Sequence, residues 1–360
     1  MGIYFFLIGA ELCIPFLFAG MENKEKRDRR ILFFSVFIIF LLMALKAPTV
    51  GRDIPGYQNM YELTRYRDWG DFDLSWMESG YEILMMIFSK VFCVPFQVFM
   101  AAIYGFVYLS YYLFLKRYSE DFTTSVLIYI CFTFMTFDMS AIRTVLGVAI
   151  CLNAIPFATE KGLKNTILFV LITLLATQFH KSAYIFFIAF FIIRIPFTLW
   201  TSILYIGIPI VVLINKRELL YFIDTYFKQI NETSSAMGGN LLVYMLCLLL
   251  TGFIWYKCDR EEEEREVGAF STTGLAVRMI YAGILIQLIA SNTVLSRMAE
   301  YMQIFIIVLI PNNICRLDDK SRIIVKLALY ILAIVYFWRF SLLTNTLDIV
   351  PYTFFWNTPS

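Results

Sequence analysis

Two arginines near the ends of apolar segments are the first candidates for chemistry in this sequence. Arg143 lies in FDMSAIRTVLGVAIC and Arg297 in TVLSRMAEYMQ, with Asp138 and Glu300 as nearby carboxylates. A charged side chain at membrane depth is costly and is kept mostly where it is paired or lines a wet cavity. The planar guanidinium fork matches two oxygens of a phosphate group. We therefore expect the two arginines to bind a diphosphate, with Asp138 orienting Arg143. The alternative is that they snorkel to lipid head groups.

Two residues are candidates for proton transfer. His180, the only histidine, lies in TQFHKSAYIFF beside Lys181. Imidazole titrates near neutrality, so it can accept a proton or donate to phosphate, and Lys181 and the membrane should lower its pKa. Asp53 follows Arg52 and precedes a proline turn that could carry it over an acceptor. The sequence leaves both bases open, with a slight preference for His180, whose alternative role is interfacial hydrogen bonding. Lys181 and Arg52 add positive charge for a diphosphate.

Aromatic residues crowd the polar segment between Gly51 and Glu82, which interrupts an otherwise apolar chain. Their rings could stack on sugar faces, although an aromatic belt at the lipid head groups would have the same composition. Another tyrosine precedes the C-terminus in Pro351-Tyr352. The candidate sugar-binding residues are Tyr57, Tyr61, Tyr81 and Tyr352, with Tyr66, Trp69 and Trp76 as further aromatic side chains in the segment.

The elements that must position these residues are membrane helices. Hydrophobic residues make up 60% of the 360 residues and the mean hydropathy is +0.71, which no soluble fold could bury. We expect an all-α, polytopic membrane protein that forms a single integral membrane domain over residues 1–360, with about twelve transmembrane helices. The predicted spans lie near residues 3–20, 31–46, 96–115, 122–137, 139–157, 165–179, 183–195, 199–214, 241–256, 274–290, 298–314 and 322–338.

Charge distribution predicts the orientation of these spans. The basic run in residues 22–30 should be cytoplasmic by the positive-inside rule, which places both termini outside and makes residues 3–20 a retained first span. The stretch 81–94 is too short for an ordinary span and should be re-entrant or interfacial. Residues 47–80 and 215–240 then form two extracytoplasmic loops, and residues 257–273 are cytoplasmic. All candidate site residues therefore face outward.

Several classes of function find no support in the sequence. There is no P-loop, dinucleotide glycine pattern, HExxH or GxSxG motif. A single histidine and seven widely spaced cysteines give no metal or redox pattern, so we expect no metal and no cofactor. The net charge of +2 and the dispersed basic residues predict no nucleic-acid partner.

An ordered set of motifs resembles a known family along essentially the whole chain. The set consists of Val50-Gly51-Arg52-Asp53, Tyr57, Tyr61, Ser79-Gly80-Tyr81-Glu82, Arg143, His180-Lys181-Ser182-Ala183, Arg297 and Pro351-Tyr352. It resembles the EpsG-like family of Wzy-type polysaccharide polymerases, which act in O-antigen, capsule and exopolysaccharide biosynthesis. Many relatives carry Gly-Thr-Asp where this chain has Gly51-Arg52-Asp53, so Asp53 matches the family pattern and Arg52 departs from it.

The resemblance implies a GT-C-like glycosyltransferase in the bacterial inner membrane, with its site facing outward. It would join oligosaccharide repeat units carried on undecaprenyl diphosphate, with the glycosyl-phosphate bond supplying the energy and no metal or nucleotide at the site. The implied partners are the lipid-linked oligosaccharide, membrane lipids and a chain-length regulator protein. Two alternatives stay open: a flippase or transporter of lipid-linked oligosaccharides, and a membrane acyltransferase of surface glycans.

Overall fold

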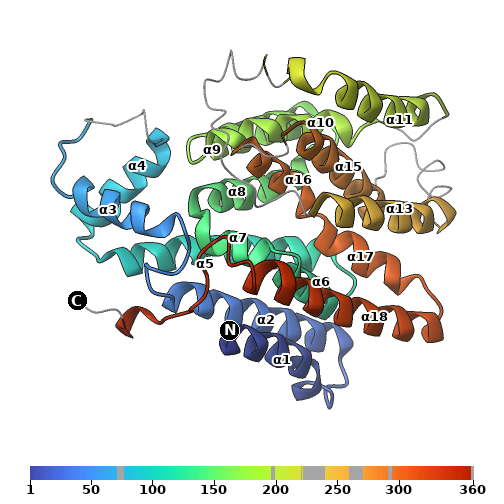
Figure 1. Ribbon diagram of the computed structural model, residues 1–360, viewed down its shortest axis with the longest axis horizontal. Coiled ribbons are helices and arrows are strands. Elements are labelled where there is room, and N and C mark those ends of the chain that lie inside the picture. Colours follow the sequence, from blue (N-terminus) through green and yellow to red (C-terminus); the bar gives the residue numbers. More distant parts are fainter. Residues whose placement is uncertain are drawn as a thin grey trace.

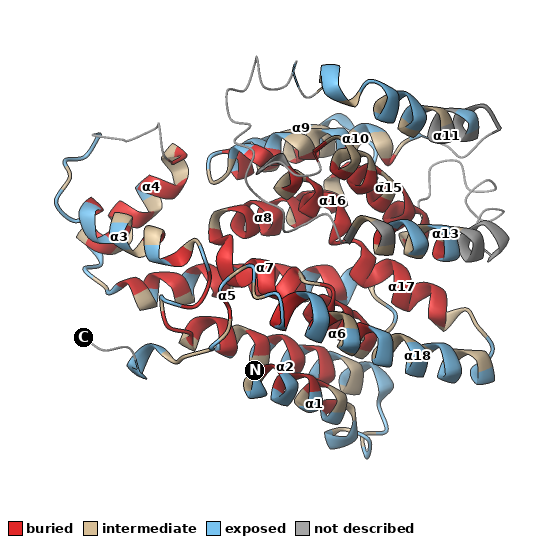
Figure 2. Cartoon of the chain, viewed as in Figure 1, coloured by how far each residue is buried: buried red, intermediate tan, exposed pale blue. Residues whose placement is uncertain are grey.

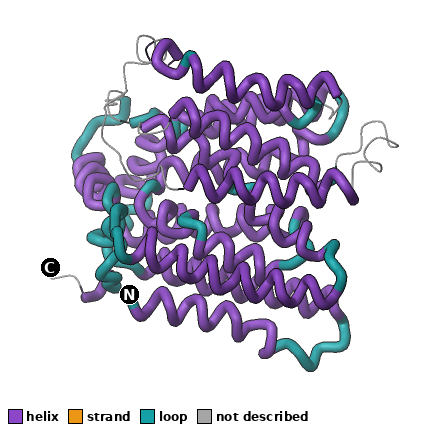
Figure 3. Tube along the Cα trace, turned by 45° about the vertical axis from the view of Figure 1, so that its right-hand side comes forward, coloured by secondary structure: helices purple, strands orange, loops and turns teal. Residues whose placement is uncertain are grey.

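The computed structural model describes residues 1–70, 77–195, 199–219, 221, 240–258, 271–290 and 294–357. Over these residues the chain is helical, and its one β-type contact is an isolated bridge between Lys46 and Phe354. The predicted all-α class is therefore confirmed. The long helices lie roughly parallel in stacked rows, and the connections gather at the two ends of the bundle (Figure 1, Figure 3). The helices of the bundle are α1 (Gly2–Leu17), α2 (Lys24–Leu45), α5 (Phe96–Tyr118), α6 (Phe122–Cys131), α7 (Phe134–Ser140), α8 (Ile142–Thr159), α9 (Leu163–Thr177), α10 (Phe187–Ile192), α11 (Leu199–Ile214), α13 (Asn240–Cys258), α15 (Thr272–Ala290), α16 (Glu300–Gln303), α17 (Ile306–Cys315) and α18 (Asp319–Phe337).

Local sequence explains where several of these helices begin. Asn23 caps α2, because its side chain accepts a hydrogen bond from the Lys26 backbone N–H. Asp121 caps α6 in the same way, and Asp318 caps α18. Such side chains satisfy backbone donors that have no partner inside the first turn of a helix. The start of each of these helices is thus fixed by a polar residue just before its first turn.

Among the residues that the structure describes, length and composition make five helices candidate membrane spans, or six if a bent pair counts as one. The bent pair is α6 and α7, which meet at 56°. Shorter apolar helices cover residues 2–17, 163–177, 181–192 and 243–252. The structure therefore supports a polytopic helical membrane protein, while the count of about twelve spans remains a prediction. Burial agrees with a membrane setting: α8 and the helices of residues 296–315 lie in the interior, whereas α18 exposes an apolar face (Figure 2).

The polar segment that precedes α5 contains more helix than expected. Residues 47–80 include α3 (Ile54–Thr64), and residues 81–94 consist mainly of α4 (Ser79–Met86) and the π-helical turn η1 (Ile87–Val91). Both short helices lie at the same end of the bundle as the C-terminus (Figure 1). We call this the α3–α4 end. Its membrane side and the re-entrant course of residues 81–94 remain predictions. The single-domain division and the extracytoplasmic loop over residues 215–240 also remain predictions, and residues 220 and 222–239 of that loop lie outside the described residues.

The C-terminal segment packs along the chain that leads into α3. The backbone N–H of Ala47 donates to the Thr353 carbonyl at 2.8 Å, and that of Arg52 donates to the Leu347 carbonyl at 2.9 Å. The Tyr352 hydroxyl donates to the Leu42 carbonyl at 2.7 Å. These contacts join the two ends of the sequence and fix the segment that carries Asp53.

Candidate active site

Glu78 lies at the centre of a charged cluster at the α3–α4 end. Its Oε2 lies 2.9 Å from the terminal nitrogen of Arg143, and its Oε1 lies 3.2 Å from Nδ1 of His180. The same Oε1 accepts a hydrogen bond from the Lys181 backbone N–H at 2.9 Å. One carboxylate therefore joins the start of α8 to the link after α9. Glu78 was not among the residues predicted from the sequence, although it directly precedes the Ser79-Gly80-Tyr81-Glu82 motif.

Close packing between α4 and the end of α9 positions Glu78. The Tyr81 backbone N–H donates to the Gln178 carbonyl at 3.2 Å, and the Ser79 hydroxyl donates to the Gln178 side chain at the same distance. A Cβ at Gly80 would lie 2.7 Å from the Gln178 carbonyl oxygen. Only glycine leaves room for this approach, so Gly80 sets the distance between Glu78 and His180.

Arg143 is held by two partners from the polar segment. Besides its ion pair with Glu78, its Nε donates to the Tyr57 hydroxyl at 3.2 Å, and its guanidinium carbon lies 5.3 Å from the Tyr57 ring centre. The expectation that Asp138 orients Arg143 is wrong: Asp138 is buried and accepts a hydrogen bond from the Tyr129 hydroxyl. The reason is the break at Ala141 between α7 and α8, which separates the two side chains despite their closeness in sequence.

Arg297 forms a second ion pair, with Asp53. The guanidinium nitrogen of Arg297 lies 3.1 Å from Oδ2 of Asp53, and both side chains are partly exposed. The Asp53 backbone N–H donates to the Ser140 hydroxyl at 3.2 Å, next to the start of α8. Gly51 allows this approach, since its φ is +106° and a Cβ would lie 2.1 Å from the Met139 carbonyl oxygen. Glu300, the carboxylate near Arg297 in sequence, is buried in the bundle.

The electrostatics of the cluster fix two protonation states. Burial raises the pKa of Glu78, but the hydrogen bond and charge of His180, the charge of Arg143 and the Lys181 N–H lower it to about 2. Burial lowers the pKa of His180, Glu78 opposes this, and the charges of Arg143 and Arg297 lower it further. At neutral pH Glu78 is ionised and His180 is neutral. The expected direction for His180 is confirmed, although burial and the two arginines cause it rather than Lys181.

The ionised carboxylate also selects the histidine tautomer. A carboxylate can only accept hydrogen bonds, so Nδ1 of His180 must carry the proton that points at Glu78. Nε2 then presents a lone pair. Glu78 thus orients His180 in the manner of the acidic member of a catalytic triad, which leaves a neutral imidazole ready to accept a proton.

The other predicted cations lie at the edge of the cluster. Lys181 joins it through its backbone N–H, and its side chain is exposed. Arg52 is also exposed, and its backbone N–H bonds to the C-terminal segment. With His180 neutral, the cluster has a net charge of +1. Three cations, Arg143, Arg297 and Lys181, face two carboxylates, Glu78 and Asp53. Among the described residues, no group of three or more His, Cys, Asp or Glu side chains could hold a metal ion.

The predicted sugar-binding tyrosines have different surroundings. Tyr57 is buried beside Arg143, and Tyr81 is fully buried, with no hydrogen-bond partner for its hydroxyl. Tyr61 packs against Phe99 with ring centres 4.9 Å apart. Tyr352 holds the C-terminal segment to α2. Trp76 lies outside the described residues.

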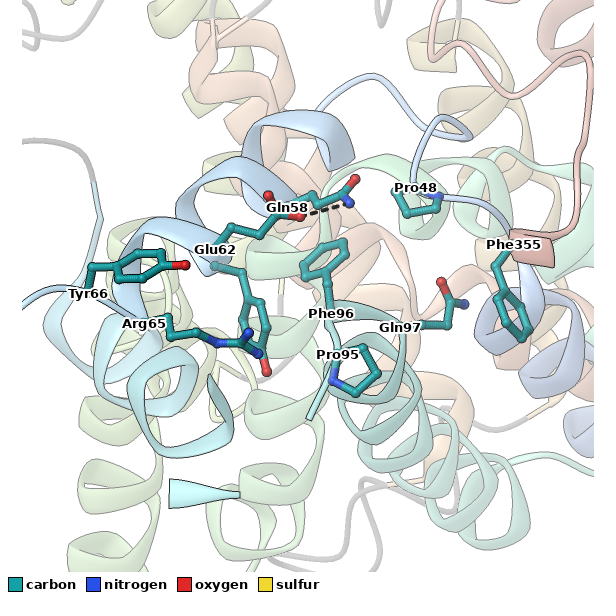
Figure 4. Close-up of a pocket in the computed structure, with 10 residues that line it drawn as sticks. Pro48, Gln58, Glu62, Arg65, Tyr66, Pro95, Phe96, Gln97 and Phe355 are labelled. Atoms are coloured by element: carbon teal, nitrogen blue, oxygen red, sulfur yellow. Dashed lines mark hydrogen bonds between the residues drawn. The ribbon is translucent and has the colours of Figure 1, made fainter. Parts of the chain in front are cut away.

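A pocket of about 500 Å³ opens beside α3, and Tyr61 forms part of its wall. Arg65, Glu62 and Gln58 line it together with aromatic rings, and Gln58 donates to Glu62 at 3.1 Å (Figure 4). Polar groups interleaved with rings suit a saccharide better than a hydrocarbon. The pocket extends the polar surface of the α3–α4 end beyond the charged cluster.

A second hollow, of about 520 Å³, lies between α4, η1, α5, α8 and α9 and is almost entirely apolar. We call it the apolar groove. Leu146, one of its lining residues, follows Arg143 by about one helical turn on α8. Phe179, another, directly precedes His180. The groove therefore begins next to the charged cluster.

Comparison with known proteins gives one match. A family model described as the EpsG family matches residues 29–354, nearly the whole chain. The match includes all the candidate site residues from Arg52 to Tyr352. No curated protein and no solved structure matches the chain.

Proposed function

Because the chain belongs to the EpsG family, the Wzy-like polymerase family, we propose that it joins lipid-linked oligosaccharide repeat units at the outer face of the bacterial inner membrane. The proposed donor is a glycan on undecaprenyl diphosphate, and the acceptor is the terminal sugar of another lipid-linked unit. One observation carries this proposal: a neutral histidine, held by a carboxylate, lies beside paired arginines at one end of an apolar helix bundle.

The proposed reaction is a single glycosyl transfer. An acceptor hydroxyl forms a bond to the anomeric carbon of the donor while the bond from that carbon to the diphosphate oxygen breaks. Nε2 of His180 takes the acceptor proton, and the lipid diphosphate leaves with the electron pair. The glycosyl-phosphate bond supplies the energy, so the step balances without a nucleotide or a metal. Asp53 is the alternative base, although its ion pair with Arg297 favours a binding role.

The arginines have the complementary task of stabilising the leaving group. Negative charge grows on the diphosphate as the bond breaks, and fixed cations lower the energy of that state most when they need no reorganisation. Arg143 is fixed by Glu78 and Tyr57, and Arg297 by Asp53. Arg297 is the more exposed of the two, and a diphosphate can exchange with its carboxylate partner. Lys181 adds charge at the edge.

Reconstitution provides the test. The purified protein in lipid nanodiscs should convert a purified lipid-linked repeat unit, without nucleotide, into a ladder of longer lipid-linked glycans. Each added unit should release one lipid diphosphate. A flippase would only move the unit across a vesicle membrane, and an acyltransferase would require an acyl donor. Protein that binds the unit but gives no ladder and releases no lipid diphosphate would contradict the proposal.

A further inference from the structure

We propose that the apolar groove binds the polyisoprenoid chain of the lipid-linked substrate, next to its diphosphate. This rests on the proposed function and assigns a second part of the substrate to residues outside the charged cluster. The groove has a volume of about 520 Å³, and its wall includes Leu84, Ile103, Leu109, Leu146, Ile150 and Phe179. That volume is in the range of small-molecule sites, so it holds the part of a long chain nearest the head group.

Continuity with the charged cluster identifies the occupant. On α8 the groove residues Leu146 and Ile150 follow Arg143 at helical spacing, so they lie along one face below the guanidinium. Just after α9 the chain passes from the groove to the cluster, because Phe179 lines the groove and the next residue, His180, contacts Glu78. A molecule with a diphosphate head and a hydrocarbon chain can therefore occupy both sites at once.

The groove extends along the helices away from the cluster. On α5 its lining runs from Ala102 to Leu113, which corresponds to about 16 Å of helix. That is roughly half of the hydrocarbon thickness of a bilayer. Phe96, at the start of α5, packs against Tyr61 of α3 with ring centres 5.5 Å apart, so the groove runs along α5 away from the α3–α4 end.

The groove wall suits a hydrocarbon and offers little to a polar group. Its two polar side chains, Ser110 and Asn153, satisfy each other and their own helices. The Asn153 amide donates to the Ser110 hydroxyl at 2.9 Å and to the Ala149 carbonyl at 2.8 Å, and the Ser110 hydroxyl donates to the Phe106 carbonyl at 2.9 Å. Neither side chain has an N–H or O–H left to donate to an anionic head group, so the head group belongs in the cluster.

The floor and the rim of the groove differ in exposure. Ile103 and Leu146 on the floor are 3% and 4% exposed, whereas Leu109 and Leu175 on the rim are 57% and 52% exposed. A chain can therefore enter sideways from the bilayer without a helix opening. Because surrounding lipid is as apolar as the groove, the gain comes from shape and packing instead of the hydrophobic effect. The groove thus aligns the substrate with the cluster.

Photo-crosslinking tests the assignment. A lipid-linked repeat unit that carries a diazirine in its isoprenoid chain is bound to the full-length protein in phospholipid nanodiscs, illuminated, and mapped by mass spectrometry. We expect labels on α5, α8 and α9 around the groove, and competition by unlabelled lipid-linked unit but not by added phospholipid. Labels spread over all lipid-facing helices would mean that the groove holds bulk phospholipid only, and would overturn the proposal.

Groove-filling variants add a second readout. Ile150→Trp fills the floor, and Leu109→Trp narrows the exposed rim, where an indole does not disturb the core. Each should weaken crosslinking and kcat/KM for the long-chain donor by about ten-fold, the scale at which a hydrophobic site senses a change in shape. A donor that carries the diphosphate without an isoprenoid chain should lose little. Leu327→Trp, on a lipid-facing position of α18 that is 58% exposed, is the matched control.

The outcomes separate this assignment from the proposed function. Groove-specific crosslinking in a protein that forms no glycan ladder would support the groove and contradict the polymerase. If both tryptophan variants form normal glycan ladders and crosslink the long-chain donor as the unchanged protein does, the polymerase proposal is supported and the groove assignment is overturned. Equal losses of kcat/KM in Leu327→Trp and Leu109→Trp would also overturn the groove assignment, because a tryptophan at any lipid-facing position would then have the same effect.

Discussion

Replacing Glu78 by glutamine should damage proton transfer more than it damages the fold. The amide keeps the shape of the side chain but removes the charge that faces Arg143 and His180. An amide can either donate or accept, so it no longer forces the proton of His180 onto Nδ1. With the orientation of the base lost, we expect the rate of glycosyl transfer to fall on the order of 10²-fold.

The stability term follows from the pKa of Glu78. Its side chain is 8% exposed, and a fall of the pKa from 4.5 to about 2 corresponds to at most about 3 kcal/mol of folding free energy. A carboxyl with a lowered pKa stabilises the fold above its unfolded pKa. That contribution is lost as the pH falls from about 4.5 toward 2. At neutral pH, Glu78→Gln should therefore lower the melting temperature of the protein while leaving it inserted and folded.

The pH profile of polymerisation makes the assay specific. Glu78 raises the pKa of His180 against the larger effect of burial, so removing its charge lowers that pKa further. The acidic limb of the rate profile should then move to lower pH in Glu78→Gln. The matched control is Glu82→Gln on α4, one turn after Glu78; the Glu82 carboxylate pairs with Arg67 at 2.8 Å. An unchanged limb and a near-normal rate in Glu78→Gln, or the same shift in Glu82→Gln, would refute this reasoning.

Four further predictions concern the cluster and its setting. Arg143→Lys and Arg297→Lys keep the positive charge but lose the planar guanidinium fork, so each should lower kcat/KM on the order of 10²-fold. A normal rate would show that the fork is unnecessary. Arg67→Lys is the control, since Arg67 pairs with Glu82. In single-turnover polymerisation, His180→Gln should abolish the acidic limb of the pH profile while Asp53→Asn keeps it and raises KM, and the reverse would make Asp53 the base. Gly80→Ala should push α4 away from Gln178, which should destabilise the fold by about 1–3 kcal/mol, lower the melting temperature and slow glycosyl transfer. Gly9→Ala, with open space around it, should change neither the melting temperature nor the rate. The orientation can be tested in a variant whose native cysteines are changed to serine. An impermeant thiol reagent outside the cell should label Tyr66→Cys, at a position that is 83% exposed, but not Glu25→Cys. The opposite pattern would reverse the predicted orientation.

Some features of this protein are determined by its sequence alone, because they depend on local properties. Hydropathy identified an all-helical membrane protein, since a run of apolar residues needs lipid or a protein core wherever it lies. The few charged and polar residues at the ends of its apolar segments could also be identified as site candidates from the sequence. The structure brings Arg143, His180, Arg297, Asp53 and Tyr57 to one end of the bundle, and the family match confirms the resemblance that the ordered motifs suggested.

Tertiary structure alone decided how those groups are paired. Asp138 is five residues from Arg143 in sequence, yet a break between helices turns it toward Tyr129, while Glu78, 65 residues away, takes its place. The ring of Tyr81 looked available for sugars, but packing against Phe99 buries it, whereas Tyr61 packs against the same ring and still lines the pocket beside α3. The apolar groove was invisible in the sequence, because each helix contributes only a few of its residues. Which residues meet depends on helix ends that approach across long separations, and hydropathy carries no information about that approach.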